Sequence, residues 1–245
     1  LMKRINKITK DESFSLEKDF KIYWMNNPIA TIIPGKDYLS PSLTLITDDA
    51  IETKSKEKLK LYLQNWLINQ IKENLKDLIN LKNDNIKSSN VRALCFQLYE
   101  QNGVMKRDEI KELLKKFDLK EKSLLRKMGI KIGRYHVFLH RMLKPKAVVL
   151  RINLWKNFFK DTQKFEPPKF GLNFIFDQKI KNNKFLLICG FENFGNFYIR
   201  VDILERLFIK IIDSSNKGKF KLVSEMLNLV GCNKENFQKL LKLMN

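Results

Sequence analysis

The sequence predicts an α+β protein that is mainly α: a helical bundle with small β elements and a C-terminal winged-helix-like or helix-turn-helix unit. Three observations predict this class. Apolar residues recur at helical spacing from about residue 55, short amphipathic segments then alternate with polar turns, and short β-prone runs stand near both ends. Each amphipathic helix must bury its apolar stripe against a neighbour, so the helices are expected to form a bundle.

Residues 1–50 are predicted to form a small β-rich segment. Turn-forming sequences separate its β-prone runs at residues 29–33 and 43–46, namely NNP at 26–28, PG at 34–35 and SP at 40–41. From about Ser55 a helix of about 25 residues is expected, since one stripe is apolar while Lys56, Lys60, Lys72 and Lys76 lie off it. Those lysines are predicted to face solvent.

Residues 51–162 are predicted to form a helical bundle with a basic β element. Ser88 or Ser89 caps one helix, Gly103 ends it, and Asp118 caps a later helix that ends at Gly129. Alternating apolar residues on both sides of Gly133 then predict a hairpin with a bulge. Pro145 stands where the first residue of another helix is expected.

Residues 169–245 are predicted to form the winged-helix-like C-terminal domain, after a linker at residues 165–169. Strands are expected at 185–188 and 198–201, and Asp202 with Glu205 matches a capping box for the next helix. Two short helices follow, separated by Gly231, with Asn233 as the cap of the second. This is the outline of a helix-turn-helix, whose second helix would bring Lys234 and Lys239 to a groove.

The chain carries 47 Lys+Arg against 27 Asp+Glu, a net charge of +20. Such a charge attracts nucleic acid or an anionic membrane, although the bias of an A+T-rich genome towards Lys, Asn, Ile and Phe also explains part of it. The distribution is more specific, because residues 122–160 contain eleven Lys and Arg and neither Asp nor Glu. Four of the nine arginines of the chain fall in this window, and codon bias explains neither them nor the missing acids.

We therefore predict that cations of this window contact the phosphates of nucleic acid. The predicted binding residues are Arg126, Lys127, Lys131, Arg134, Arg141, Lys144, Lys146 and Arg151. Aromatic residues in the same window fit either base stacking or a protein core, namely Tyr135, Phe138, Trp155, Phe158 and Phe159.

No catalytic or metal site is predicted. The chain has no Gly-x-x-x-x-Gly-Lys-Ser/Thr phosphate loop, and Cys95, Cys189 and Cys232 are expected to be reduced core residues. His136 and His140 have the spacing of two ligands on one helical face, but Arg134 and Arg141 flank them and no carboxylate is near in sequence. Both are interpreted as surface histidines. A cofactor is likewise not expected, and the sequence assigns no reaction to the chain itself.

No run reaches the roughly 18 to 20 apolar residues of a membrane span, and the N-terminus lacks the apolar region of a signal peptide. We expect a cytoplasmic protein with no membrane partner. The start at Leu1 favours a fragment or an unusual start codon.

Residues 129–145 (GIKIGRYHVFLHRMLKP), 198–206 (YIRVDILER) and 225–233 (EMLNLVGCN) together resemble the C-terminal region of alphaproteobacterial DEAD/DEAH-type helicases related to the mitochondrial degradosome RNA helicase. Residues 92–98 (RALCFQL), Pro34-Gly35 and Leu154-Trp155 fit the same region in the same order. The chain departs from that pattern at His136 and His140, and it ends at Asn245 where the family continues.

The resemblance implies an accessory nucleic-acid-binding region of an ATP-dependent RNA or DNA helicase. Its partners would be single-stranded or duplex nucleic acid and the motor domains of the parent chain, and ATP and Mg²⁺ would be bound by that parent motor. The alternative is a stand-alone basic nucleic-acid-binding protein of replication or plasmid maintenance. A structural protein whose charge reflects codon bias alone is a third hypothesis.

Overall fold

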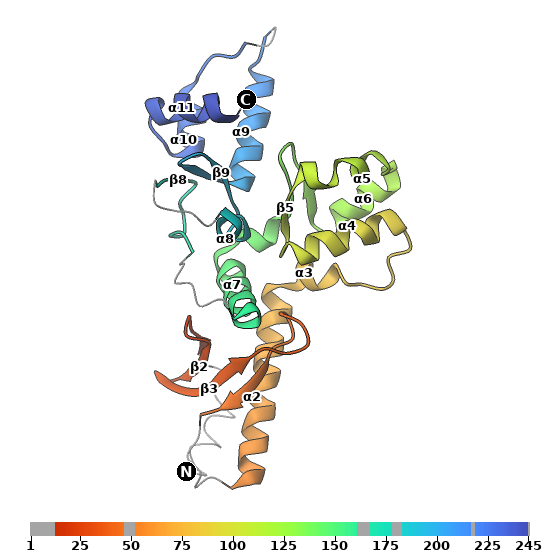
Figure 1. Cartoon of the computed structure of the whole chain (residues 1–245), viewed down its shortest axis with the longest axis vertical. Helices are drawn as coiled ribbons and strands as arrows, with labels where there is room; N and C mark the ends of the chain where they lie inside the picture. The colour runs from red at the N-terminus through yellow and green to blue at the C-terminus, as the bar shows by residue number, and fades with distance from the viewer. Residues whose placement is uncertain (1–12, 47–51, 161–166, 178–182, 217–218, 245) are drawn as a thin grey trace. The chain divides into compact units, whose positions relative to one another are not determined.

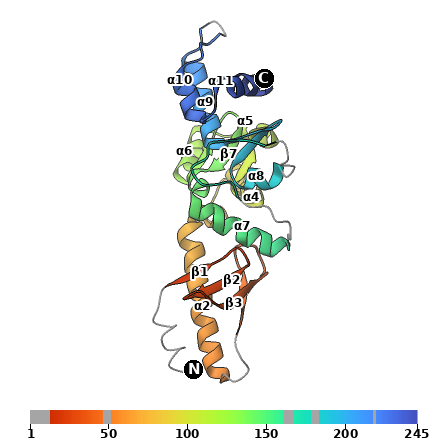
Figure 2. The ribbon, with the colours of Figure 1, turned by 90° about the vertical axis from the view of Figure 1, so that its left-hand side faces the viewer.

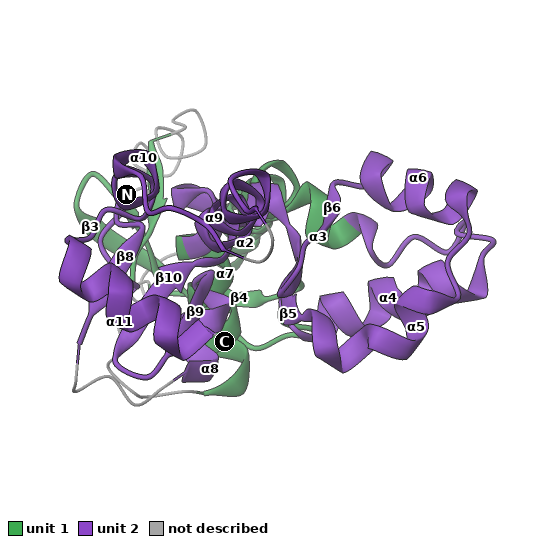
Figure 3. Ribbon diagram, turned by 90° about the horizontal axis from the view of Figure 1, so that it is seen from above, with its two compact units in different colours: residues 1–79, 149–164 green, residues 80–148, 165–245 purple. Residues whose placement is uncertain are grey.

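The chain is described by a computed structural model that covers residues 13–46, 52–160, 167–177, 183–216 and 219–244. The described residues are mainly helical with short strands, which confirms the α+β, mainly α class. The chain divides into two compact units, coloured separately in Figure 3. The first comprises residues 1–79 and 149–164, and the second comprises residues 80–148 and 165–245.

The first unit pairs a small sheet with a long helix (Figures 1 and 2). Its antiparallel strands lie in sequence order, β1 (Phe14–Leu16), β2 (Lys21–Trp24), β3 (Asn27–Ile33) and β4 (Ser42–Leu45). The expected long helix is present as α2 (Thr53–Asn74), and it buries Leu59, Leu63, Leu67 and Ile71 at helical spacing. The Phe14 ring lies 5.5 Å from the Trp66 ring, so the sheet packs on this helix.

The second unit begins with helices and a three-stranded antiparallel sheet. After α3 (Lys76–Asn80), which crosses the boundary between the units, the elements follow in order: α4 (Ser89–Glu100), β5 (Val104–Lys106), the 3-10 helix η1 (Arg107–Ile110), α5 (Lys111–Lys115), α6 (Leu119–Lys127), β6 (Ile130–Ile132), β7 (His136–Leu139), η2 (His140–Leu143) and α7 (Pro145–Phe159). The strand order in the sheet is β5-β7-β6. From residue 149 onward α7 belongs to the first unit.

Local capping explains where these helices begin. Ser88 accepts a hydrogen bond from the Val91 backbone N–H at the start of α4. Asp118 and Glu121 form a reciprocal capping box at the start of α6. Both caps are as predicted from the sequence, as is Pro145 at the first position of α7.

The remainder of the second unit contains β8 (Phe174–Phe176), α8 (Asn183–Ile188), β9 (Phe191–Phe194), β10 (Phe197–Arg200), α9 (Val201–Asp213), α10 (Ser224–Val230) and α11 (Lys234–Met244). Its sheet has the order β8-β10-β9. A core of Phe197, Leu204, Leu207, Met226 and Phe237 joins this sheet to the three last helices. A smaller cluster of Val104, Phe138 and Val201 joins the two halves of the unit.

Two expectations for residues 169–245 need correction. The apolar run at 185–188 forms helix α8 instead of a strand, because a short apolar run has no periodicity that separates the two. The expected pair of short helices is present as α10 and α11, and the described strands of this range precede them. Asp202 and Glu205 form no capping box, because Glu205 binds another part of the chain. The linker predicted at 165–169 lies partly outside the described residues.

Among the described residues, none of the helices combines the length and the apolar character that crossing a membrane would require.

Candidate nucleic-acid interface

The basic window contributes cations from α6 and from the β6–β7 hairpin. Arg126 and Lys127 are exposed in the last turn of α6, where positive charge is also favourable to the helix dipole. Lys131 is exposed in β6, and Arg134 is exposed in the turn that leads to β7. These four residues lie within a short stretch of one unit, as the sequence predicts.

Three further predicted cations follow in η2 and at the start of α7. Arg141, Lys144 and Lys146 are all exposed and belong to the second unit with the others. Arg151 differs, because it is fully buried in the part of α7 that belongs to the first unit. Its neighbours at 150, 152, 153 and 154 are buried as well, so α7 is enclosed around most of its circumference. A buried guanidinium presents nothing to a phosphate, and the structure therefore removes Arg151 from the predicted set.

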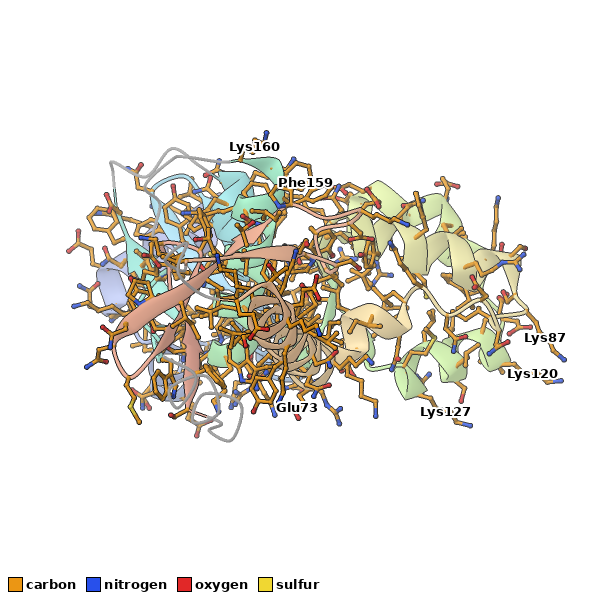
Figure 4. All side chains as sticks on the ribbon, turned by 90° about the horizontal axis from the view of Figure 1, so that it is seen from below. Glu73, Lys87, Lys120, Lys127, Phe159 and Lys160 are labelled. Atoms are coloured by element: carbon orange, nitrogen blue, oxygen red, sulfur yellow. The ribbon has the colours of Figure 1, made fainter. Side chains whose placement is uncertain are left out.

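Two lysines outside the predicted set extend this surface. Lys120 of α6 and Lys87 are exposed, and they line a cavity of about 610 Å³ with Lys127 and with Asn80, Asn83 and Asn85. The side chains of Lys87, Lys120 and Lys127 point away from the ribbon (Figure 4).

Lys120 lies outside the acid-free window, because Glu121 precedes the first residue of that window. In the structure this carboxylate is already bound. It accepts hydrogen bonds from the backbone N–H of Asp118, from the Ser88 hydroxyl and from Asn90. These hydrogen bonds, that from Ser88 first, hold the pKa of Glu121 below its usual value. A count of charges along the sequence does not show that the Glu121 carboxylate is already hydrogen-bonded at the start of α6.

The hairpin turn is held by a carboxylate from a distant helix. Glu205 of α9 accepts hydrogen bonds from the backbone N–H groups of Arg134, Tyr135 and His136, the last two at 2.8 and 3.0 Å. A side chain at residue 133 would displace this carboxylate, because a Cβ atom there would lie 2.2 Å from the Glu205 carboxyl carbon. The turn that carries Arg134 is therefore fixed by three charge-assisted hydrogen bonds.

His136 is buried, in contrast to its interpretation as a surface histidine. Its Nε2 lies 2.6 Å from Oε2 of Glu192 in β9, and its Nδ1 lies 3.7 Å from Oε1 of Glu205. Lys106 pairs with His136 in the β5–β7 register, and its Nζ lies 3.2 Å from the other Glu192 oxygen. His140 is exposed in η2 and shares none of these contacts, so the two histidines are not brought together.

These contacts shift the ionisation of all three groups. Burial alone would lower the pKa of His136, but the hydrogen bond to Glu192 and the nearby Glu205 carboxylate outweigh it and raise that pKa. Burial would raise the pKa values of Glu192 and Glu205, but the nearby His136 imidazole, which is hydrogen-bonded to Glu192, and the backbone N–H donors lower both. These three side chains thus join the hairpin to β9 and α9.

The aromatic residues of the window differ in their exposure. Phe138 is buried, and Tyr135 is half-buried with its ring 5.6 Å from the Phe208 ring. Trp155 and Phe158 are half-buried in the first unit, where Phe159 is exposed. Burial therefore excludes Phe138 from stacking on a base, whereas the other four rings keep part of their surface exposed. Lys234 and Lys239 of α11 are exposed, with Lys239 paired to Glu235.

Comparison with known proteins found no match for this chain among protein-family models, curated proteins or solved structures.

Proposed function

We propose that this chain binds single-stranded or duplex nucleic acid through α6, the β6–β7 hairpin and the start of α7. The observation that carries the proposal is the exposure of Arg126, Lys127, Lys131, Arg134, Arg141, Lys144 and Lys146 in a segment without a single Asp or Glu. Such a surface neutralises phosphates and releases their counterions, which drives binding.

The topology of this part of the second unit supports the same proposal. The order α4-β5-α5-α6-β6-β7, with the sheet order β5-β7-β6, is that of winged-helix domains. In helix-turn-helix proteins the second helix enters the major groove, and here that helix is α6. Lys120, Arg126 and Lys127 would then lie along the nucleic acid, with Lys131 and Arg134 of the hairpin beside it.

We further propose that the chain serves as the accessory C-terminal region of an ATP-dependent helicase. The support is the resemblance of residues 129–145, 198–206 and 225–233 to that region of DEAD/DEAH-type helicases. In such a protein the motor domains would bind ATP and Mg²⁺, and this chain would guide the strand that leaves the motor.

Neutralising three cations of the interface tests the binding proposal. We expect the triple variant Arg126→Gln, Lys127→Gln and Lys131→Gln to bind a single-stranded oligonucleotide much more weakly. The loss of three phosphate contacts should also flatten the slope of log K against log salt by about 2. Fluorescence anisotropy with a labelled oligonucleotide, titrated over a range of salt concentrations, measures both quantities.

The matched control neutralises Lys58, Lys60 and Lys72 of α2, which are exposed in the first unit. It removes the same charge from a face that the proposal leaves in solvent. If both triple variants lose equal affinity, only net charge matters and the assigned interface is wrong. Circular dichroism melting of each variant shows whether the fold is retained.

A further inference from the structure

A second cavity, of about 530 Å³, lies in the second unit away from the outward side chains of α6. Its wall is formed by the end of β5, by η1 and α5, by the hairpin turn and by β9. This volume falls within the roughly 300–1,000 Å³ that is usual for small-molecule sites. It is large enough for one nucleotide.

Positive charge dominates the wall of this cleft. Five cations line it, from β5, η1, α5 and the hairpin turn: Lys106, Arg107, Lys111, Lys115 and Arg134. Two carboxylates also line it, Asp108 and Glu192. Glu192 is already bound to His136 at 2.6 Å and to Lys106 at 3.2 Å, so its charge is balanced within the protein.

The side chains of Lys111 and Arg134 are the cations best placed for an anion. Arg107 donates one guanidinium hydrogen bond to the Gly133 carbonyl, which fixes it against the hairpin turn. Lys115 pairs with Glu112, but both groups are exposed and such a pair is weak. The Arg134 guanidinium lies 5.5 Å from the centre of the Phe208 ring, a contact that leaves its N–H donors available for a phosphate.

The cleft also contains aromatic and amide groups. Tyr135 and Phe194 line it, and both are half-buried. The Tyr135 ring is held edge-on against Phe208, so it is positioned before any ligand arrives. Asn193 lies beside Phe194 on the same wall. Aromatic side chains next to cations are the combination that binds a base and its phosphate together.

We propose that this cleft binds one nucleotide, with its phosphate held by Lys111, Lys115 and Arg134 and its base against Tyr135 or Phe194. The same chemistry fits a free mononucleotide or one nucleotide of a strand. This proposal does not depend on the α6 surface, because Arg126, Lys127 and Lys131 do not line the cleft. Arg134 is the residue that the cleft shares with the predicted interface.

Isothermal titration calorimetry tests the site with four probes: adenosine 5′-monophosphate, adenosine, inorganic phosphate and a short oligoadenylate. We expect the monophosphate to bind more tightly than adenosine or inorganic phosphate, since the site offers groups for both parts. If inorganic phosphate binds as tightly as the nucleotide, the base part of the proposal is wrong. If neither the nucleotide nor the oligonucleotide binds, the whole proposal is wrong. If adenosine 5′-monophosphate binds more tightly than the oligoadenylate, the ligand is a free mononucleotide. If the oligoadenylate binds more tightly, the ligand is one nucleotide of a strand.

Variants locate the binding in the cleft. The double variant Lys111→Ala and Arg134→Ala should lower nucleotide affinity by at least about tenfold, because it removes two charge-assisted contacts. The control Lys116→Ala and Lys184→Ala removes the same charge from exposed lysines of the second unit that do not line the cleft. Equal losses in the two double variants would overturn the assignment.

A substitution at Asp108 should change nucleotide affinity in the opposite direction. Its carboxylate is exposed on the wall and repels a phosphate, so Asp108→Asn should raise nucleotide affinity by about threefold. A mere loss of folding cannot produce tighter binding. The triple glutamine variant of α6 should keep its nucleotide affinity, which separates a failure of this site from a failure of the α6 interface.

Discussion

The His136 imidazole lies between the carboxylates of Glu192 and Glu205 and is fully removed from solvent. The charged groups that face it come from three other elements: Lys106 of β5, Glu192 of β9 and Glu205 of α9. Arg134 and Tyr135 adjoin it in the turn. Because the hairpin and the C-terminal half meet at this residue, its protonation affects the stability of the whole second unit.

We expect the free energy of unfolding to include a pH-dependent contribution from this group. The pKa of His136 is raised above 6.5, so its contribution is full below pH 6.5 and is lost as pH rises through the raised value. The pKa values of Glu192 and Glu205 are lowered from 4.5. Their contribution to the free energy of unfolding is therefore full above pH 4.5 and is lost as pH falls through the lowered values. The contribution is therefore greatest between these limits.

Urea unfolding of the wild type and of His136→Gln, measured from pH 5 to 9, checks this prediction. Glutamine keeps a donor near Glu192 but does not titrate. The wild type should be the more stable at low pH, and the difference between the two proteins should shrink as pH rises above about 6.5. A difference that stays constant with pH would show that the pKa of His136 is the same in the folded and unfolded protein, and a difference that grows as pH rises would show that folding lowers it.

Individual residues also show where sequence reasoning reached its limit. Glu192 and Glu205 are 56 and 69 residues from His136 in the chain, so no local pattern reveals them as its partners. A buried histidine and a surface histidine look alike in a sequence. Arg151 was likewise predicted as exposed from its charge, whereas helix packing buries it. Burial of a polar residue is decided by tertiary contacts, which a local pattern does not contain.

Helix α6 depends on its capping box for its first turn. Asp118→Ala removes the acceptor of the Glu121 backbone N–H, which lies 2.7 Å from its carboxylate oxygen. We expect it to lower the free energy of unfolding by about 1 kcal/mol, measured by urea unfolding. The control Asp84→Ala removes an exposed aspartate from a turn and should change stability by less than about 0.5 kcal/mol. Equal effects of the two variants would mean that the cap contributes nothing.

At the level of elements, local signals predicted helix ends better than strands. Ser88, Asp118, Asn233 and Gly231 act locally, and each occupies the capping position that its chemistry predicts. The Asp202–Glu205 spacing matches the same rule, yet Glu205 binds the hairpin turn because three converging N–H groups outcompete the one at the start of its own helix. The spacing of two residues identifies a possible capping interaction within their own helix. It does not identify the distant N–H groups that bind Glu205 instead.

The whole molecule is built from segments that are not consecutive. Residues 149–164 belong with residues 1–79, and residues 80–148 belong with residues 165–245. The sequence ranges 1–50, 51–162 and 169–245 follow changes in composition along the chain. A return of the chain to an earlier unit leaves no such change, because the unbroken helix α7 runs across the boundary between the two units. The exposure of most cations of the basic window was nevertheless predictable, because a stretch without Asp or Glu is visible in the sequence itself.

The chain as a whole should hydrolyse no ATP, with or without nucleic acid. It contains no phosphate loop of the Gly-x-x-x-x-Gly-Lys-Ser/Thr type, which motor ATPases need to hold the β- and γ-phosphates. Phosphate release is measured on purified protein that has been shown to bind an oligonucleotide. Turnover that is stimulated by RNA and co-elutes with the chain would contradict this prediction and would require a different reading of its function.

The carboxylate of Glu205 determines which fragments of this chain retain a complete hairpin turn. Residues 89–139 contain a complete set of helices and strands, and by topology alone they form a module that could be transplanted. Yet the anion that completes their hairpin turn is supplied by α9, which the chain reaches only after β10. A fragment that ends before α9 would present three converging N–H groups to solvent or to a foreign anion. The basic hairpin is therefore complete only when two distant parts of the chain, the hairpin itself and α9, are both present.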